Sequence, residues 1–363
     1  MSKTEIVVGT HTDLSGPVAS IGVSGANAAR LRFDEVNAQG GIHGRKLRFI
    51  VEDHQYQVPR AVQGANKLIN RDRVFVMLGA LGTPMNNAVM NDQLAAGIPN
   101  LFPLSAARQM AEPFNRMKFA NLSTYYDQIR AGIKWMVENK GKKNLCLLYQ
   151  DTDFGRESLL GAQDQAKAMN LTILETATNR PTDTDFSAQM AKLRAANCDL
   201  IALGTVVRDT ILPYGTARRM GWNDVEFIGQ SAGFDQTVAG APARATEGLY
   251  IAAGTYMPYR DTASPTVIAW WDAYKQKFGA DPNIGSVYGY VGADLLIAAL
   301  DRAGKDLTTE KLITALEGIG GYSDIFGGPV LSFGPDKRQG TRNVLLFQVQ
   351  NGRYSFVQGP LQY

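Results

Sequence analysis

The sequence predicts an α/β protein made of two Rossmann-like lobes. Short runs of β-branched and aliphatic residues alternate with longer amphipathic stretches along most of the 363 residues. This rhythm is typical of βαβ units that form parallel sheets. The series occurs twice, at roughly 5–120 and at roughly 144–250, and a chain of this length is enough for about two domains.

The elements of each series follow from the apolar runs and from the helical periodicity between them. In the first series we expect strands at 6–9, 47–53, 74–80 and 98–102, with helices near 23–38, 59–70 and 85–96. In the second we expect strands at 144–149, 171–176, 200–205 and 225–230, with helices near 126–139, 155–169, 186–196 and 208–220. Within 126–139, for example, Ile129, Ile133 and Met136 recur at helical spacing.

The last hundred residues differ from both series. Helices are expected near 264–278 and 288–303, followed by a β-hairpin within 344–357. Asn351-Gly352 is the turn pair of that hairpin, because both residues accept a positive φ. A helix pair and a hairpin after two α/β series imply that the chain returns to each lobe. The hinge would then contain several crossing segments.

Composition excludes several classes of function. The chain has 45% hydrophobic and 20% charged residues, and a net charge of +3, which does not indicate nucleic-acid or membrane partners. No signal peptide is visible at Met1–Glu5, so the protein is either cytosolic or has lost its leader. Cys146 and Cys198 lie in or just before apolar strands and are predicted to be buried free thiols. A bridge is possible if their strands are neighbours.

A glycine-rich loop follows the first strand, in LSGPVASIGVSGANAA at residues 14–29. Gly16, Gly22 and Gly25 do not match GxGxxG, and no Gly-Lys-Ser/Thr follows them, so a nucleotide site is not favoured. We interpret the glycines as a device for close helix packing. Helix N-termini and strand ends share one crevice in such sheets, which favours a small anion such as a carboxylate.

Catalytic chemistry is not indicated. The three histidines, His11, His43 and His54, are dispersed and form no HxxxH or paired-carboxylate pattern. The sequence has no metal-ligand spacing. His11 stands near the end of the first strand and could touch a cleft there.

Several segments together resemble one family. TDLSGPVASIG, NAQGGIHGRKLRFIVED, LYQDTDFGRESL and WWDAYKQKFGADPN occur in the order found in type I periplasmic solute-binding proteins. The chain resembles most the leucine/isoleucine/valine-type receptors of ABC importers, over nearly its whole length. The resemblance implies lobes at 1–122 plus 254–329 and 123–253 plus 330–363, joined by three crossovers and closing on a ligand. It also implies a periplasmic monomer that serves a membrane permease, with its signal peptide removed and with no cofactor, metal or nucleic acid.

The resemblance places candidate ligand contacts in the first lobe. Thr83 matches the residue whose hydroxyl bonds the ligand carboxylate, with Leu81 and Gly82 beside it. The next loop would contribute the backbone of Leu104 and Ala106 together with Ser105. Thr83 and Ser105 would also serve as helix N-caps without any ligand. Two further contacts are expected, from Ile21 in the opening loop and Tyr256 near a crossover.

The second lobe would supply Tyr125, Phe154, Thr205, Val206 and Ser231. Arg208 could pair with a ligand carboxylate or with the acid beside it.

The ligand class is inferred from departures from the family pattern. Ala106, Tyr125 and Ser231 stand where amino-acid receptors place acceptors for the α-ammonium, and an ammonium buried without acceptors costs several kcal/mol. We therefore expect a carboxylate without an α-amino group, such as a benzoate, a phenylpropenoate or a keto acid. An apolar wall would be offered by Leu104, Tyr125, Phe154, Tyr256 and Tyr288. The alternatives are an amino-acid or amide receptor, a cytosolic sensor of the same fold and an NAD-dependent enzyme.

Overall fold

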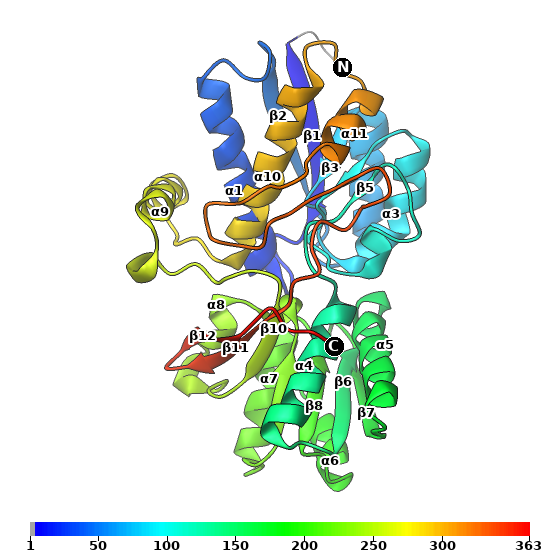
Figure 1. Cartoon of the computed structure of the whole chain (residues 1–363), viewed down its shortest axis with the longest axis vertical. Coiled ribbons are helices and arrows are strands. Elements are labelled where there is room, and N and C mark those ends of the chain that lie inside the picture. Colours follow the sequence, from blue (N-terminus) through cyan, green and yellow to red (C-terminus); the bar gives the residue numbers. More distant parts are fainter. Residues whose placement is uncertain (1–3) are drawn as a thin grey trace. The chain divides into compact units, whose positions relative to one another are not determined.

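The computed structural model describes residues 4–363 and divides into two α/β units (Figure 1). Unit 1 contains the chain up to Leu122 together with Tyr256–Thr341. Unit 2 contains Ser123–Thr255 and Arg342–Tyr363. The prediction of a two-lobed α/β fold is confirmed, and each unit is built from more than one segment of the chain.

Unit 1 is organised around a five-stranded parallel sheet in the order β2-β1-β3-β4-β5. Its strands are β1 (Glu5–Thr12), β2 (Lys46–Asp53), β3 (Val76–Leu78), β4 (Asn100–Leu101) and β5 (Lys118–Phe119). Its helices are α1 (Ala19–Ala38), α2 (Val58–Asn66), α3 (Thr83–Ala95), α9 (Pro265–Phe278), α10 (Ile284–Ala303) and α11 (Thr309–Glu317). The predicted helix at 59–70 changes to a π-helix at Lys67–Arg71. The two-residue strand β5 and helix α11 were not predicted.

Unit 2 contains a seven-stranded sheet in the order β12-β11-β10-β9-β8-β6-β7. Its strands are β6 (Leu145–Gln150), β7 (Ile173–Asn179), β8 (Leu200–Gly204), β9 (Glu226–Gly229), β10 (Tyr250–Ala253), β11 (Leu345–Gln350) and β12 (Arg353–Gln358). Its helices are α4 (Tyr125–Lys140), α5 (Asp153–Ala168), α6 (Ser187–Ala195), α7 (Val207–Arg219) and α8 (Gln236–Ala239). Strand β10 was missed, although it joins the parallel part of the sheet to the hairpin.

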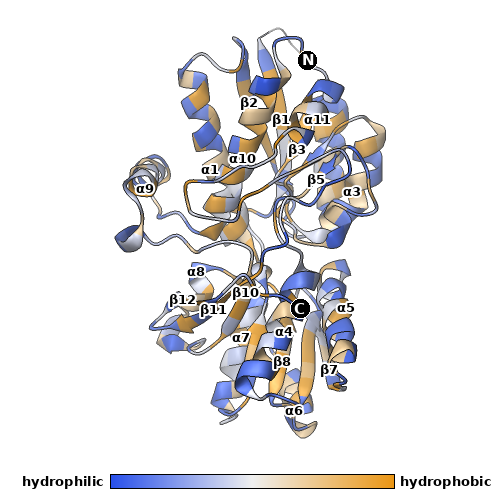
Figure 2. Ribbon diagram, viewed as in Figure 1, coloured by the Kyte–Doolittle hydropathy of each residue, from blue (hydrophilic) through white to orange (hydrophobic). Residues whose placement is uncertain are grey.

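The predicted C-terminal hairpin is confirmed. Strands β11 and β12 pair antiparallel, and Asn351 and Gly352 turn between them with φ angles of 55° and 74°. The central strands of both sheets are coloured mainly as hydrophobic in Figure 2, while hydrophilic residues lie mainly on helices, loops and edge strands. This distribution is expected when helices cover a parallel sheet on both faces.

The third boundary between the units lies later than expected. The expected change of lobe at 329/330 falls instead after Thr341. Residues 330–341 belong to unit 1 because Leu331 pairs with Tyr322, and Gln339 pairs with Ala120. The buried guanidinium of Arg338 also donates to Glu317 at 2.6 Å.

Helices α1 and α10 lie side by side in unit 1 at unusually close range (Figure 1). A Cβ atom on Gly289 would lie 2.0 Å from the carbonyl oxygen of Gly25. A Cβ atom on Gly22 would likewise lie 1.9 Å from the carbonyl oxygen of Asp13. The glycines therefore allow α1 to approach both the end of β1 and α10, as the interpretation of the glycine loop requires.

Helix α10 is also long and apolar enough to pass a test for membrane spans by length and composition. Most of the helix is buried inside unit 1, where it packs on α1. Its apolar character is that of a core helix.

The two cysteines form a disulfide, which corrects the prediction of free thiols. Strands β6 and β8 are direct neighbours, and Cys146 on β6 is bonded to Cys198, two residues before β8. The Cα atoms are 5.8 Å apart, within the normal range for a bridge. The sequence left the bridge open because spacing alone does not show which strands are adjacent.

The packing of α1 on α10 predicts that alanine substitutions at two glycines of α10 will differ in their effect on stability. Gly289→Ala should lower the free energy of unfolding by about 1–3 kcal/mol or more, because the new methyl group meets backbone that cannot move away. Gly292→Ala should stay within about 1 kcal/mol of wild type or exceed it, because alanine favours helix and its nearest contact is at 3.6 Å. Urea unfolding of both variants measures the difference. Equal stability would contradict the close approach.

The disulfide should stabilise unit 2 by closing a long loop. The bridged cysteines are 52 residues apart, and such a bridge typically contributes about 2–4 kcal/mol. We expect reductant to lower the unfolding midpoint of wild type and to leave that of a Cys146→Ala/Cys198→Ala variant unchanged. If a thiol reagent labels cysteines in denatured, unreduced wild type, the assignment of the disulfide is wrong.

Candidate functional site

The loop between β3 and α3 is held as an extension of the sheet. Leu81 donates its N–H to the carbonyl of His11 at 3.0 Å, and Gly82 donates to the carbonyl of Leu104 at 3.2 Å. Leu81 and Leu104 form an isolated parallel bridge. Gly82 has a φ of 93°, a backbone angle that residues with a side chain rarely adopt. The structure thus brings together the two loops that the sequence analysis chose in the first lobe.

Two hydroxyl groups meet where these loops adjoin. Thr83 Oγ1 and Ser105 Oγ lie 2.8 Å apart, and both side chains are buried. One hydroxyl donates to the other, so the accepting group keeps its own proton for a further acceptor. The pair can therefore present an O–H donor to an anion.

Neither hydroxyl acts as the predicted helix cap. Gly82 is the N-cap of α3, and Thr83 is already the first helical residue. After Ser105 the chain forms only a short 3₁₀ turn at Arg108–Met110, whose N-cap is Ala107. Ser105 Oγ accepts a long bond of 3.4 Å from the Ala107 N–H. Helix α3 therefore begins at Thr83, before the position that the sequence suggested.

The buried side chain of His54 bonds to the loop between β3 and α3. His54 Nδ1 accepts the N–H of Tyr56 at 3.0 Å, so Nε2 carries the proton and donates to the Leu81 carbonyl at 3.0 Å. Burial lowers the pKa of His54. The neutral ring therefore fixes the orientation of the Leu81 carbonyl without adding charge.

His11 does not reach a surface, which corrects the expectation that it could touch a cleft. Its side chain is fully buried, with its ring centroid 5.6 Å from that of His54. Burial, with a smaller contribution from His54, lowers the pKa of His11 to about 3. The histidine is neutral at any ordinary pH.

The glycine-rich loop has its own internal anion. The buried carboxylate of Asp13 accepts N–H bonds from Ser15, Gly16 and Val18 at 3.2, 2.5 and 3.0 Å. These donors would otherwise be open to a phosphate. The interpretation of the loop as something other than a phosphate site thereby gains a physical reason. Ile21 lies within α1 rather than in the loop, and it is buried.

In unit 2, two aromatic candidates meet at the starts of adjacent helices. Tyr125 is the first residue of α4, and Phe154 is the second residue of α5. Their rings are 5.1 Å apart and nearly perpendicular, an attractive edge-to-face geometry. Both side chains are buried and form an apolar corner.

The other unit 2 candidates are tied together by amide side chains. Thr205 Oγ1 lies 2.8 Å from Thr210 Oγ1, and the Thr205 carbonyl accepts from Gln230 Nε2 at 3.0 Å. Ser231 donates its N–H to Gln128 Oε1 at 2.8 Å. Val206 is the N-cap residue of α7. Gln128 and Gln230 were not singled out from the sequence, where a lone glutamine on a helix or after a strand carries no signal.

Arg208 is occupied within unit 2. Its guanidinium donates to Asp209 at 2.8 Å and to the Pro181 carbonyl at 2.6 Å. Burial raises the pKa of Asp209. The charge and hydrogen bond of Arg208 and the hydrogen bond of Asn179 act in the opposite direction and lower that pKa. This arrangement favours the local salt bridge over the ligand contact that the sequence allowed.

The remaining candidates lie in unit 1. Ala106 is buried, Tyr256 is 36% exposed, and Tyr288 on α10 lines a small cavity together with Leu104. Within residues 4–363 no group of three or more His, Cys, Asp or Glu side chains is placed to hold a metal ion.

Comparison with known proteins decides the family. Residues 5–353 match the periplasmic binding protein family. The chain is a type I periplasmic binding protein. It belongs to the solute-binding proteins of the ABC-transporter type, as the resemblance implied, and members of this family are binding proteins rather than enzymes.

Relatives of this binding protein differ in what their names say they bind. It is 25% identical to the Leu/Ile/Val-binding protein homolog 8 of Brucella abortus, over 96% of this chain and 89% of the relative. It is 27% identical to a fatty acid ABC transporter substrate-binding protein from Thermomonospora curvata, with a TM-score of 0.89 over 99% and 92% of the two chains. A branched-chain amino acid ABC transporter protein from Thermus thermophilus with bound valine has a TM-score of 0.90 at 18% identity, over 100% and 98%.

The buried His11 makes a prediction about pH. A pKa of about 3 in the folded protein means that only the unfolded chain takes up the proton as pH falls below about 6.5, its ordinary value. Stability is complete above that pH and falls by about 1.4 kcal/mol per pH unit toward pH 3. Between pH 7.5 and 4.5, the free energy of unfolding of His11→Phe, measured with denaturant, should fall by about 2–3 kcal/mol less than that of wild type.

Thr178→Val, which changes no titratable group and lies on the exposed face of β7, provides the control for this measurement. It should keep the wild-type pH dependence. An unchanged slope in His11→Phe would show that His11 is not buried in the neutral form.

Proposed function

We propose that this binding protein captures a small hydrophobic or aromatic carboxylate without an α-amino group and delivers it to the permease of an ABC importer. The observation that carries the proposal is the buried pair of Thr83 and Ser105, which lie 2.8 Å apart. Together with the backbone of Leu104 and Ala106, the pair would hold the carboxylate. Neutral donors in a site shielded from water bind an anion more strongly than they do in solution.

The opposite end of the ligand meets no acidic partner in this proposal. Ala106, Tyr125 and Ser231 occupy the positions from which an ammonium would be neutralised. The fully buried carboxylates Asp13 and Asp209 are occupied by local donors. Asp235, also fully buried, caps α8 through Thr237. A ligand without a cation avoids the cost of several kcal/mol for an unpaired buried charge.

The aromatic corner of Tyr125 and Phe154 supports an apolar body for the ligand. Burial of such a body contributes about 25 cal/mol per Å² of apolar surface. The Thermomonospora curvata relative is named for fatty acids, which also carry a carboxylate and no amine. The names of the Brucella relatives keep a branched-chain amino acid as the alternative.

The disulfide supports an extracytoplasmic location. Structural disulfides persist in oxidising compartments such as the periplasm and are rare in the cytosol. The bridge between Cys146 and Cys198 therefore favours a transport role over a cytosolic sensor of the same fold. We propose that the protein is periplasmic and monomeric.

Calorimetric titration tests the ligand class. We expect binding of at least one of benzoate, cinnamate, a branched keto acid and octanoate, and none of leucine. Thr83→Val should weaken that binding about tenfold or more, because a buried anion loses a hydroxyl donor. Thr178→Val, on the exposed face of β7, is the matched control and should bind as wild type does. Tight binding of leucine without binding of any acid would refute the proposal.

A further inference from the structure

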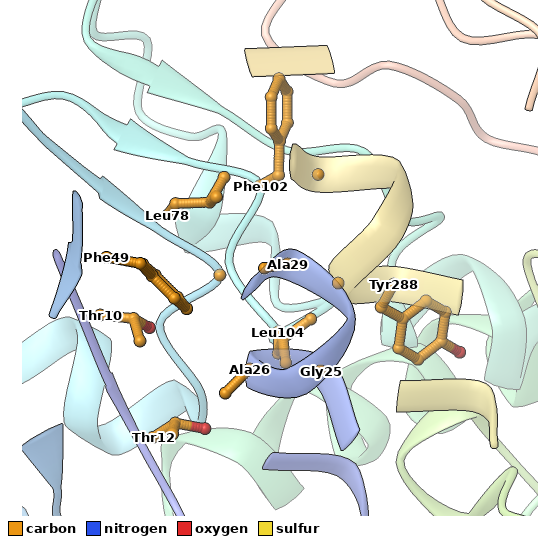
Figure 3. Close-up of a pocket in the computed structure, with 13 residues that line it drawn as sticks. Thr10, Thr12, Gly25, Ala26, Ala29, Phe49, Leu78, Phe102, Leu104 and Tyr288 are labelled. Carbon is orange, nitrogen blue, oxygen red and sulfur yellow. The ribbon is translucent and has the colours of Figure 1, made fainter. Parts of the chain in front are cut away.

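Unit 1 encloses a small cavity beneath the loops that carry Thr83 and Ser105. The cavity has a volume of about 20 Å³, enough for one water-sized group. It lies between the sheet and the helices α1 and α10, as Figure 3 shows. Its walls are mostly apolar and come from Phe49, Leu78, Phe102, Leu104, Ala26, Ala29 and Tyr288 and from glycine backbone.

Two hydroxyl groups enter this apolar cavity from β1. Thr10 and Thr12 line it and are 2% and 1% exposed. Neither Oγ1 atom has a hydrogen-bond partner in the part of the chain that the structure describes. Figure 3 places Thr10, Thr12 and Phe49 opposite Ala26, Ala29 and Leu104. Buried hydroxyls are rarely left unbonded, because each one costs about 1–3 kcal/mol.

The two hydroxyls enter the cavity from the same face of β1, because residues two apart on a strand point to one face. A hydroxyl group of a ligand both donates and accepts, so it can bond to an unpartnered threonine hydroxyl in either role.

The cavity and the proposed carboxylate site share one residue. The side chain of Leu104 lines the cavity, while its carbonyl accepts the N–H of Gly82, next to Thr83. The cavity therefore adjoins the loop that would hold the carboxylate.

We propose that Thr10 and Thr12 form a subsite that receives a hydroxyl group of the bound solute, so that hydroxylated acids are the preferred class. The proposal rests on the function proposed above, because it assigns the rest of that ligand to the same loops. The apolar walls exclude larger polar groups, and the cavity volume limits the subsite to one heavy atom and its hydrogens.

The test measures matched pairs of ligands that differ by one hydroxyl. The pairs are benzoate with para-hydroxybenzoate, cinnamate with para-coumarate, octanoate with its omega-hydroxy derivative, and phenylalanine with tyrosine. Wild type should bind the hydroxylated member of at least one pair about tenfold more tightly or better. In Thr10→Val/Thr12→Val that preference should fall to within about twofold, while affinity for the unhydroxylated member is kept.

Two further measurements separate the outcomes. Thr178→Val should keep the preference of wild type. The ligand-free threonine double variant should melt no lower than wild type, because its hydroxyls have no partner to lose. A lower melting midpoint with no change in preference would mean a structural water only and would overturn the proposal.

Failure of the ligand class can be told apart from failure of the subsite. If only amino acids bind and tyrosine exceeds phenylalanine through Thr10 and Thr12, the subsite stands and the proposed acid class falls. No hydroxyl preference in any pair, including a panel in which nothing binds, would overturn the subsite.

Discussion

Unit 1 depends on the contact between α1 and α10, where two backbones meet without side chains between them. Gly289 faces the carbonyl of Gly25 at a distance that no Cβ atom could share. This contact closes the back of the cavity that Thr10 and Thr12 enter, and it brings Tyr288 beside Leu104. A larger residue at Gly289 would push the helices apart and open the wall of the cavity. The glycines that first suggested a phosphate loop thus serve the packing of a core.

Electrostatically, the candidate site of unit 1 is close to neutral. The amide donors of the first loop bond to Asp13, and the two histidines beneath the second loop are uncharged. What remains for a ligand is a set of hydroxyl and backbone donors. Each group of that set carries at most a partial charge, and the proposed binding of a carboxylate rests on these donors.

The sequence predicted the fold well because the signals were local. Strands of four to eight residues, helices with regular periodicity and the Asn351-Gly352 turn each depend on a few neighbouring residues. The resemblance to a family was confirmed as well. Two features were missed: the two-residue strand β5 and the change of unit after Thr341. Both depend on pairing with residues that are distant in the sequence.

The candidate site was harder to predict for the same reason. The loops that carry Thr83 and Ser105 lie against each other, but Thr83 does not cap α3, whose N-cap is Gly82. The disulfide required knowledge of strand order. In the sequence, Thr10 and Thr12 are ordinary strand residues. Only the packing of helices against β1 shows that their hydroxyls are buried without hydrogen-bond partners.

The interrupted chain of each unit has a consequence for the order of events during synthesis. Helix α1 must wait for α10, which leaves the ribosome only after all of Ser123–Thr255 has been made. Unit 2 in turn lacks two strands of its sheet until Arg342–Tyr363 has emerged. Nearly the entire polypeptide must therefore be synthesised before either half can reach its final packing.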